Sequence, residues 1–366
     1  MTEQYCGSTK CAAIRSSVNK LIIFMNILLT SAGRRTYLVR YFKEALGEGS
    51  KVYAANSALS PALCEADGYV LTPLIYADEY IPFLLEFCRK HEIGLLVPLF
   101  DIDVWMISKH RDEFLKAGVF PAVSDRSVLE ICNDKLRMNE WLSGHSFSVP
   151  EYGGSVNDYR GGFPAYIKPR FGMGSIGLLK AEAKEELSPL YRICERRIED
   201  SYLRYESEEK AGLSGEGRVL IEEEIRGQEF GLDVINDFSG AFVSVVIRKK
   251  LAMRSGETDE ALVLTKEAPV YESLFELGRS VSECLHHIGN MDMDVIVSAE
   301  GPSYIIDMNA RFGGGYPFSH AAGVDLPKAY AVWAKGEKAD PSLFEVKKGI
   351  HAYKDIDIRI YEDGNV

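Results

Sequence analysis

Apolar and polar residues follow two different rhythms in the first part of this chain. Between residues 26 and about 140, short apolar runs are separated by stretches in which apolar residues recur every three or four positions. The first pattern predicts buried strands, and the second predicts helices with one apolar face. The predicted strands are Asn26–Thr30, Lys51–Ala55, Tyr69–Thr72, Gly94–Leu99 and Val119–Val123. Alternation of strands and helices with short links predicts a parallel sheet covered by helices.

The pattern of predicted strands and helices changes after Pro150. Short strands and glycine-rich turns come first, at Ala165–Pro169 and Gly172–Leu179, and a polar helical stretch follows over Glu182–Glu209. From Arg218 to about Lys335 the predicted strands are longer and more apolar. They are Val219–Glu223, Phe230–Asn236, Ala241–Arg248, Met291–Val297 and Tyr304–Met308.

Composition and charge argue against several classes of partner. The 366 residues are 46% hydrophobic and 26% charged, as in an ordinary soluble globular protein with two or three domains. The net charge of −12 argues against nucleic acid or an anionic membrane as the main partner. Seven scattered cysteines without metal-type spacing indicate free thiols in a reducing compartment. We therefore expect a cytoplasmic protein.

The apolar run Leu21–Leu29 raises the alternative of a signal peptide. It has only nine residues, too few to span a membrane, and it also fits a buried first strand followed by a loop. Met25 lies inside the run, so residues 1–24 are interpreted as an extension outside the core.

A cation site is predicted around Asp294, Asp307 and Asn309. Two apolar runs flank the turn sequence Ala299–Pro302, so a hairpin folded there places Asp294 opposite Asp307. Asn309 then shares the face of Asp307 because side chains alternate along a strand. Facing carboxylates repel unless a positive charge lies between them, and hard oxygen ligands suit Mg²⁺. The alternative is that the acids line a solvated sheet face.

A second candidate site binds phosphate. Lys168-Pro169 ends a strand and leads into Gly172–Gly177, which includes Gly174 and Ser175. Glycines allow close backbone approach to phosphate, and a preceding lysine adds positive charge. The same residues also suit a glycine-rich hairpin turn without a ligand.

Several further residues are candidates only in combination. Lys135 precedes a helix that runs to about Ser143, and an ordinary solvated lysine is its alternative interpretation. Arg311 faces the same way as Asp307 on an extended backbone, so it suits either a transferring phosphoryl group or a structural role. The remaining candidates are the acidic run Glu222, Glu223, Glu224 and Ile225 with the following Glu229, and the basic cluster Arg248, Lys249, Lys250 and Arg254.

Two polar loops follow predicted parallel strands, where ligands usually bind. They are Ser31–Arg35 and Phe100–Asp103. The first has one glycine and lacks the GxGxxG pattern of dinucleotide-binding domains, which disfavours a dehydrogenase. Arg34 and Arg35 suit anionic substrate groups, whereas Asp101 and Asp103 suit an amine.

Taken in their order along the chain, the candidate residues from Lys135 to Arg311 resemble the motifs of the ATP-grasp superfamily. The resemblance covers residues 26 to about 340. The likeness extends to single-unit proteins similar to the large subunit of carbamoyl-phosphate synthase, through Thr30–Arg35, Lys250–Thr258 and Asn309–Pro317. The resemblance implies an α/β and α+β chain with a Rossmann-like parallel-sheet domain at 25–130 and an ATP-grasp domain at 131–340. The latter comprises a lid subdomain at about 150–220 and an antiparallel-sheet catalytic subdomain at about 221–340. A C-terminal segment at 341–366 completes the chain.

The resemblance also implies roles for matching residues. Lys135, Lys168 and the loop of Gly174 and Ser175 would contact ATP phosphates. Residues 222–225 would hold adenine, and Glu229 the ribose. Asp294, Asp307 and Asn309 would bind two Mg²⁺ ions, with Mn²⁺ as a substitute. Arg311, Arg254 and Lys250 would act in catalysis. Many relatives have glutamate in place of Asp307.

The implied activity is that of an ATP-dependent ligase. A small-molecule carboxylate would become an acyl phosphate, and an amine would displace phosphate to form an amide. The alternatives are carbamoyl-phosphate-synthase-type activation of bicarbonate or carbamate, and a non-catalytic ATP-binding protein. Likeness to relatives also admits a homodimer, whereas neither nucleic acid nor a membrane is an expected partner.

Overall fold

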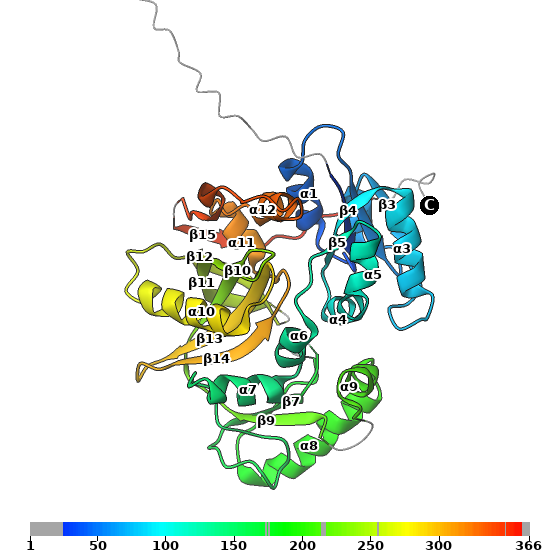
Figure 1. Cartoon of the computed structure of the whole chain (residues 1–366). Helices are drawn as coiled ribbons and strands as arrows, with labels where there is room; N and C mark the ends of the chain where they lie inside the picture. Colours follow the sequence, from blue (N-terminus) through cyan, green and yellow to red (C-terminus); the bar gives the residue numbers. More distant parts are fainter. Residues whose placement is uncertain are drawn as a thin grey trace, which may run out of the picture.

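Three sheets organise the chain (Figure 1). The computed structural model describes residues 25–172, 174, 176–213, 217–254, 256–347 and 349–360. The expected extension, residues 1–24, lies outside these residues. The predicted class, mixed α/β with a parallel sheet followed by antiparallel sheets, is confirmed.

The first sheet is parallel and has the strand order β3-β2-β1-β4-β5. Its strands are β1 (Asn26–Thr30), β2 (Val52–Asn56), β3 (Gly68–Leu71), β4 (Ile93–Pro98) and β5 (Phe120–Pro121). The last strand is shorter than predicted and lies at the edge, where Pro121 is tolerated because it has no N–H to donate. Helices α1 (Thr36–Ala45), α2 (Pro61–Glu65), α3 (Tyr80–Lys90), α4 (Asp101–Lys109) and α5 (Arg111–Lys116) connect or follow the strands.

Two helices lead to a small antiparallel sheet. They are α6 (Arg126–Asn133) and α7 (Lys135–Gly144). The small sheet has the order β6-β9-β7-β8, formed by β6 (Tyr152–Gly153), β7 (Ala165–Pro169), β8 (Leu179–Ala181) and β9 (Val219–Glu223). The predicted helical stretch divides into α8 (Lys184–Glu199) and α9 (Leu203–Ala211). Asp200 and Ser201, which favour turns over helix interiors, lie at the break.

The third sheet has six strands in the order β14-β13-β10-β11-β12-β15. Its strands are β10 (Gly227–Asn236), β11 (Phe242–Arg254), β12 (Glu257–Val263), β13 (Asn290–Ser298), β14 (Ser303–Asn309) and β15 (Ile350–Tyr353). The helices of this part are α10 (Tyr271–Leu285), α11 (Tyr316–Ala321) and α12 (Leu326–Trp333), followed by the 3₁₀ turn η1 (Pro341–Phe344). The segment after residue 341 therefore contributes the edge strand β15.

The apolar cores show which parts of the chain pack separately. The small sheet has a core of its own, including Ile167, Leu187, Cys194 and Ile221, all fully or almost fully buried. By contrast, one core joins α4 and α6 to the six-stranded sheet, where Trp105 belongs to the same cluster as Met293. A separate core permits the small sheet to move as a body. In Figure 1, α9 lies between the small sheet and α4.

The described cysteines are free, as expected: Cys64, Cys88, Cys132, Cys194 and Cys284. In the part of the chain that the structure describes, no helix has the length and apolar character needed to cross a bilayer.

Candidate active site

Two carboxylates face each other on the β13–β14 hairpin. Asp294 is directly opposite Asp307, and Asp292 is opposite Asn309. Gly301 in the connecting turn has a φ of +109°, which favours glycine. Residues opposite each other in an antiparallel pair project from the same face. The predicted placement of Asp294, Asp307 and Asn309 is therefore confirmed, whereas their role as metal ligands stays a prediction.

Two lysines supply the positive charge that this acidic pair requires. Lys135, the first residue of α7, places its Nζ 2.6 Å from Asp307 Oδ1. Lys250 on β11 lies 2.7 Å from Asp294 and 2.6 Å from Glu229. Asn309 donates a hydrogen bond of 3.1 Å to the other oxygen of Asp307. The six predicted site residues thus form two groups, one around each lysine, and the facing pair Asp294 and Asp307 brings the groups together.

The two carboxylates have opposite pKa shifts. Burial raises the pKa of Asp294 to about 6, and the attraction of Lys250 only partly opposes this. Burial acts on Asp307 in the same direction, but the ammonium of Lys135 outweighs it and lowers the pKa to about 2. Both pKa values lie below 7, so both carboxyl groups can be negatively charged at neutral pH. Asp307, with the lower pKa, keeps its charge to a lower pH.

The donor set of the hairpin fits Mg²⁺. It offers two carboxylates and one amide oxygen, which are hard ligands. Among the described residues, no group of three or more His, Cys, Asp or Glu could hold a metal without other donors. Mg²⁺ does not require such a group, because it commonly takes one or two carboxylates and completes its shell with water and phosphate. Lys135 and Lys250 show that this face accommodates positive charge.

Arg311 is held by a residue of the parallel-sheet part. Its Nε and Nη2 lie 2.9 and 3.1 Å from the two carboxylate oxygens of Asp101, at the start of α4. Its Nη1 donates to the Phe312 carbonyl and lies 4.0 Å from Asp292. Arg311 is therefore beside the acidic hairpin, as predicted, with its charge neutralised by Asp101. The expected role of Asp101 toward an amine is replaced in this structure by its contact with Arg311.

The glycines after Arg311 are required by two side chains of the six-stranded sheet. A Cβ atom at Gly313 would overlap the carboxyl group of Asp292, and one at Gly315 would lie 2.6 Å from Arg248 Nε. Arg248 is itself buried and bonds Asp292 at 3.0 Å. The loop consequently lies directly on this pair, which fixes its distance from the sheet.

Lys168 lies at the end of β7, but it also has a protein partner. Its Nζ is 2.5 Å from Glu222, which is buried and accepts a further bond of 2.8 Å from Asn139. In the following loop, Gly174 is exposed with a φ of +61°, and Ser175 lies outside the described residues. The phosphate-binding role of Lys168 and its loop stays a prediction.

The run Glu222–Ile225 leads from the small sheet into the six-stranded sheet. The N–H groups of Glu223 and Glu224 donate to the carbonyls of residues 151 and 164, so they are already used. The Glu224 carboxylate contacts Lys180 at 2.8 Å. Ile225, the last of the four predicted adenine residues, lies between β9 and β10.

Two predicted residues have other partners. Arg254, at the end of β11, is exposed and lies 3.0 Å from Asp259. Asp103 is fully buried and accepts hydrogen bonds from Ser31 Oγ at 2.8 Å and Tyr80 OH at 2.6 Å. Asp103 thus holds the Ser31 loop in place, so the expectation that it meets an amine is not supported by its contacts.

The sequence interpretation missed the residues that position Lys135. Asp134 accepts two hydrogen bonds from Arg170, of 2.5 and 2.6 Å, and caps α7 by accepting from the Leu136 N–H. The N–H of Lys135 donates to the Arg170 carbonyl at 3.1 Å. The Asp-Lys pair therefore joins α7 to the end of β7. An acidic residue just before a helix is a capping signal that could have indicated this.

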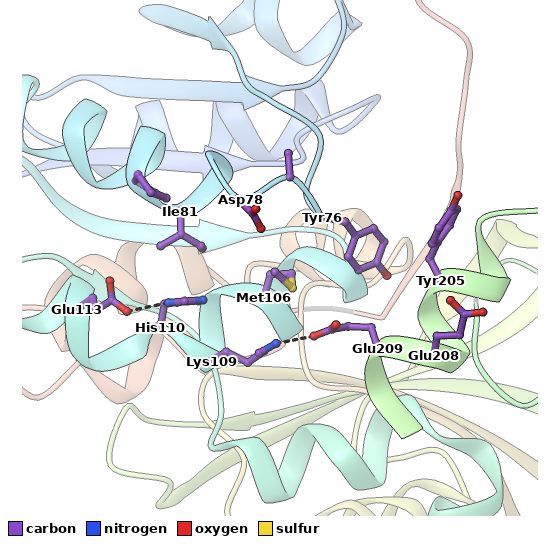
Figure 2. Close-up of a pocket in the computed structure, with 12 residues that line it drawn as sticks. Tyr76, Asp78, Ile81, Met106, Lys109, His110, Glu113, Tyr205, Glu208 and Glu209 are labelled. Atoms are coloured by element: carbon purple, nitrogen blue, oxygen red, sulfur yellow. Dashed lines mark hydrogen bonds and ion pairs between the residues drawn. The ribbon is translucent and has the colours of Figure 1, made fainter. Parts of the chain in front are cut away.

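A separate cavity of about 610 Å³ lies between α9 and the parallel-sheet part (Figure 2). Tyr76 faces Tyr205 across it, and Lys109 on α4 forms an ion pair with Glu209 on α9 at 2.5 Å. Its lining contains none of the predicted site residues. The cavity is therefore a junction between α9 and α4 outside the acidic hairpin.

Family models match two parts of this chain. Residues 161–317 match the ATP-grasp domain, and residues 27–122 match the PylC-like N-terminal domain. The chain contains an ATP-grasp domain. The matched range includes Lys168, Asp294, Asp307 and Arg311. It contains the glycine-rich loop and ends within α11.

Solved ATP-grasp structures share this fold at low sequence identity. The biotin carboxylase domain of 2-oxoglutarate carboxylase from Hydrogenobacter thermophilus, solved with MgADP, ADP and bicarbonate, has a TM-score of 0.67 and 18% identity, covering 87% of this chain and 71% of that chain. L-Amino acid ligase from Bacillus licheniformis has a TM-score of 0.61 and 16% identity, with 86% and 75% covered. N5-Carboxyaminoimidazole synthetase from Staphylococcus aureus has a TM-score of 0.64 and 14% identity, with 88% and 80% covered.

Proposed function

We propose that this chain is an ATP-dependent ligase that joins a small-molecule carboxylate to an amine through an acyl phosphate. The single observation that carries the proposal is the register of the hairpin, which places Asp294 opposite Asp307 beside Lys135 and Arg311. Such a face suits the charge of a nucleoside triphosphate with its metal. The ATP-grasp match and the ligases of the same fold support the same chemistry.

Each group of residues has a distinct task in this proposal. Asp294, Asp307 and Asn309 would hold Mg²⁺, which when bound neutralises phosphate charge. Lys135 and Lys168 would bind phosphate oxygens, each after leaving its present carboxylate partner. Arg311 uses three of its five N–H groups on Asp101 and the Phe312 carbonyl, and the remaining ones would stabilise charge on the transferring phosphoryl group.

The bond changes balance without any further reactant. An oxygen of the substrate carboxylate bonds to the terminal phosphorus while its bond to the ADP oxygen breaks. The amine nitrogen then bonds to the acyl carbon, phosphate leaves, and the nitrogen loses a proton. Acyl phosphates hydrolyse readily, so water must be excluded. The small sheet has its own core and adjoins α9, and we assign it to closure over the site.

Residues 222–225 and Glu229 would meet the nucleoside, with the linker backbone at Ile225 facing adenine. Glu229 would exchange its contact with Lys250 for ribose hydroxyls. Bicarbonate is the second candidate for the carboxylate, because the biotin carboxylase domain of the same fold was solved with that anion. That domain is described as a dimer, so a homodimer of this chain is proposed as well and can be tested by light scattering.

The test is release of ADP and phosphate from Mg·ATP with a panel of carboxylates, with and without amines. We expect ADP release to require both substrates and to disappear in Asp307→Asn. Glu300→Gln, which changes an exposed carboxylate on the turn of the same hairpin, is the matched control and should retain activity. ADP release with bicarbonate and ammonia alone would favour the second candidate. Absence of Mg·ATP binding would refute the proposal.

A further inference from the structure

Lys354 reaches the candidate active site from a part of the chain outside the ATP-grasp match. It follows β15, and its N–H donates to the Asp259 carbonyl at 2.8 Å, which continues the pairing with β12. Its Nζ lies 5.9 Å from the centre of the Phe318 ring and 3.7 Å from the position that a Cβ atom would have on Gly314. The ammonium group is therefore directed at the glycine loop that follows Arg311.

The ammonium of Lys354 has only a weak partner. Glu257 Oε2 lies 3.4 Å away, which is longer than the roughly 2.7–2.9 Å of strong charge-assisted hydrogen bonds. The Glu257 side chain is 71% exposed, whereas that of Lys354 is 24% exposed. Within the described residues, no second carboxylate lies within ion-pair distance of this ammonium. A half-buried cation with a solvated partner can exchange that partner for a ligand at little cost.

The surroundings of Lys354 place it at the far end of the same site. Burial lowers the pKa of Lys354 against the attraction of Glu257, while Arg248 and Asp292 also act on it. Arg248 and Asp292 are the two residues beneath the glycine loop, and Asp292 is 4.0 Å from Arg311. The site thus has a cation at each end of the loop, Arg311 before Gly313 and Lys354 beside Gly314.

Glu257, the partner of Lys354, also acts on a residue that follows β1. Tyr37 at the start of α1 is close enough to both Glu257 and Arg311 for each to affect its pKa, which burial raises to about 12. Arg35 acts on the same tyrosine. Tyr37 and Lys354 thus share Glu257 as a charged neighbour, and the other charged groups that act on one or the other are Arg35, Arg248, Asp292 and Arg311.

We propose that Lys354 binds a second carboxylate of the substrate, so that the ligase acts on dicarboxylic acids or dicarboxylic amino acids. The proposal rests on the function proposed above, which places the reacting carboxylate at the Arg311 end. One ammonium with Glu257 beside it matches a singly charged carboxylate better than a doubly charged phosphate. Binding would displace Glu257 from Lys354, and the freed Glu257 could accept from an amino group of the substrate.

Calorimetric titration in the presence of Mg·ADP tests this with compounds that differ only in the second carboxylate. The pairs are L-glutamate with 4-aminobutanoate, L-aspartate with β-alanine, and glutarate with butanoate. For at least one pair, we expect the wild-type chain to bind the dicarboxylate at least about tenfold more tightly, which corresponds to about 1.4 kcal/mol. Lys354→Met should abolish that preference and leave the affinity for the monocarboxylate unchanged, whereas Lys354→Arg should retain part of it.

Lys347→Met is the matched control, since Lys347 is an exposed lysine of the same C-terminal segment, and it should keep the full preference. Titration of Mg·ATP into every variant separates this inference from the proposed function. A wild-type chain that binds Mg·ATP but prefers no dicarboxylate would overturn the inference alone, as would a preference that survives in Lys354→Met. Loss of Mg·ATP binding in the wild type would instead count against the proposed function.

Discussion

Asp101 and Arg311, 210 residues apart in the chain, form a bidentate ion pair in which both side chains are almost completely buried. Asp101 begins α4 of the parallel-sheet part, and Arg311 follows β14 of the six-stranded sheet. The two parts are therefore joined at the point where we expect phosphoryl transfer. The orientation of the guanidinium depends on a carboxylate outside the range matched by the ATP-grasp model.

We predict that Asp101→Asn lowers the free energy of unfolding by about 3 kcal/mol, because it leaves a buried guanidinium without its counter-charge. Arg311→Gln should destabilise the chain by a similar amount. The double variant should lose less than the sum, since neither charge is then left unpaired. Urea unfolding of the four proteins measures this coupling. Additive losses would show that the pair does not stabilise the junction.

Lys168 and Glu222 should have separable effects on stability and nucleotide binding. Lys168→Met leaves the buried Glu222 carboxylate with Asn139 alone, so we expect a loss of about 3 kcal/mol and weaker Mg·ATP binding. The double variant Lys168→Met with Glu222→Gln should recover much of the lost stability. Its affinity for Mg·ATP should remain weak. Calorimetric titration with thermal unfolding tests both. Recovery of nucleotide affinity in the double variant would contradict a direct role of Lys168.

The three consecutive glycines should differ in their tolerance of a methyl group. Gly313→Ala and Gly315→Ala would force a Cβ atom against Asp292 and Arg248, and overpacking of this kind typically costs about 1–3 kcal/mol. At Gly314 the nearest atoms to a Cβ are 3.7 Å away, which is an ordinary contact. Gly314→Ala should therefore fold with near wild-type stability in thermal unfolding. Equal destabilisation at all three positions would refute this account of the loop.

Acid should destabilise the fold through His287. This residue is fully buried, its Nε2 lies 3.0 Å from the Val234 carbonyl, and burial lowers its pKa from 6.5 to about 4. The unfolded chain therefore binds a proton at His287 more readily than the folded chain. The contribution of neutral His287 to the free energy of unfolding is complete above pH 6.5 and is lost as the pH falls toward 4. The difference between a pKa of 6.5 and one of about 4 corresponds to about 3 kcal/mol of stability. Urea unfolding between pH 4 and 7 should show a smaller slope in His287→Gln than in the wild type.

Local sequence signals predicted the hairpin because a short turn sets the pairing of its two strands. The turn at Ala299–Pro302 was located correctly, and Asp294 lies opposite Asp307 as predicted. The sequence did not indicate the register shift between Asp294 and Val295, through which Val295 pairs with Ile305. The same reasoning gave β1, β7 and β9 with the bounds that the structure has. Signals within about ten residues were sufficient for these features.

The contacts that complete the site could not be predicted in this way. Lys135 meets Asp307, Asp101 meets Arg311, and Lys354 meets Glu257 only after distant segments have packed. A single sequence has no local pattern that pairs such residues. The phosphate-binding interpretation of the lysines accordingly omitted the carboxylates that they contact in this structure.

Lys135 and Lys250 give the acidic hairpin counterions that belong to the protein itself. A site neutralised from within does not depend on a metal for its integrity, in contrast to a structural zinc site, which unfolds when the metal is removed. Chelation of the metal should therefore abolish activity without unfolding the chain. Binding of metal and nucleotide would release the two ammonium groups from Asp307 and Asp294. The metal would then supply the positive charge in their place, so the hairpin keeps its structure through each cycle.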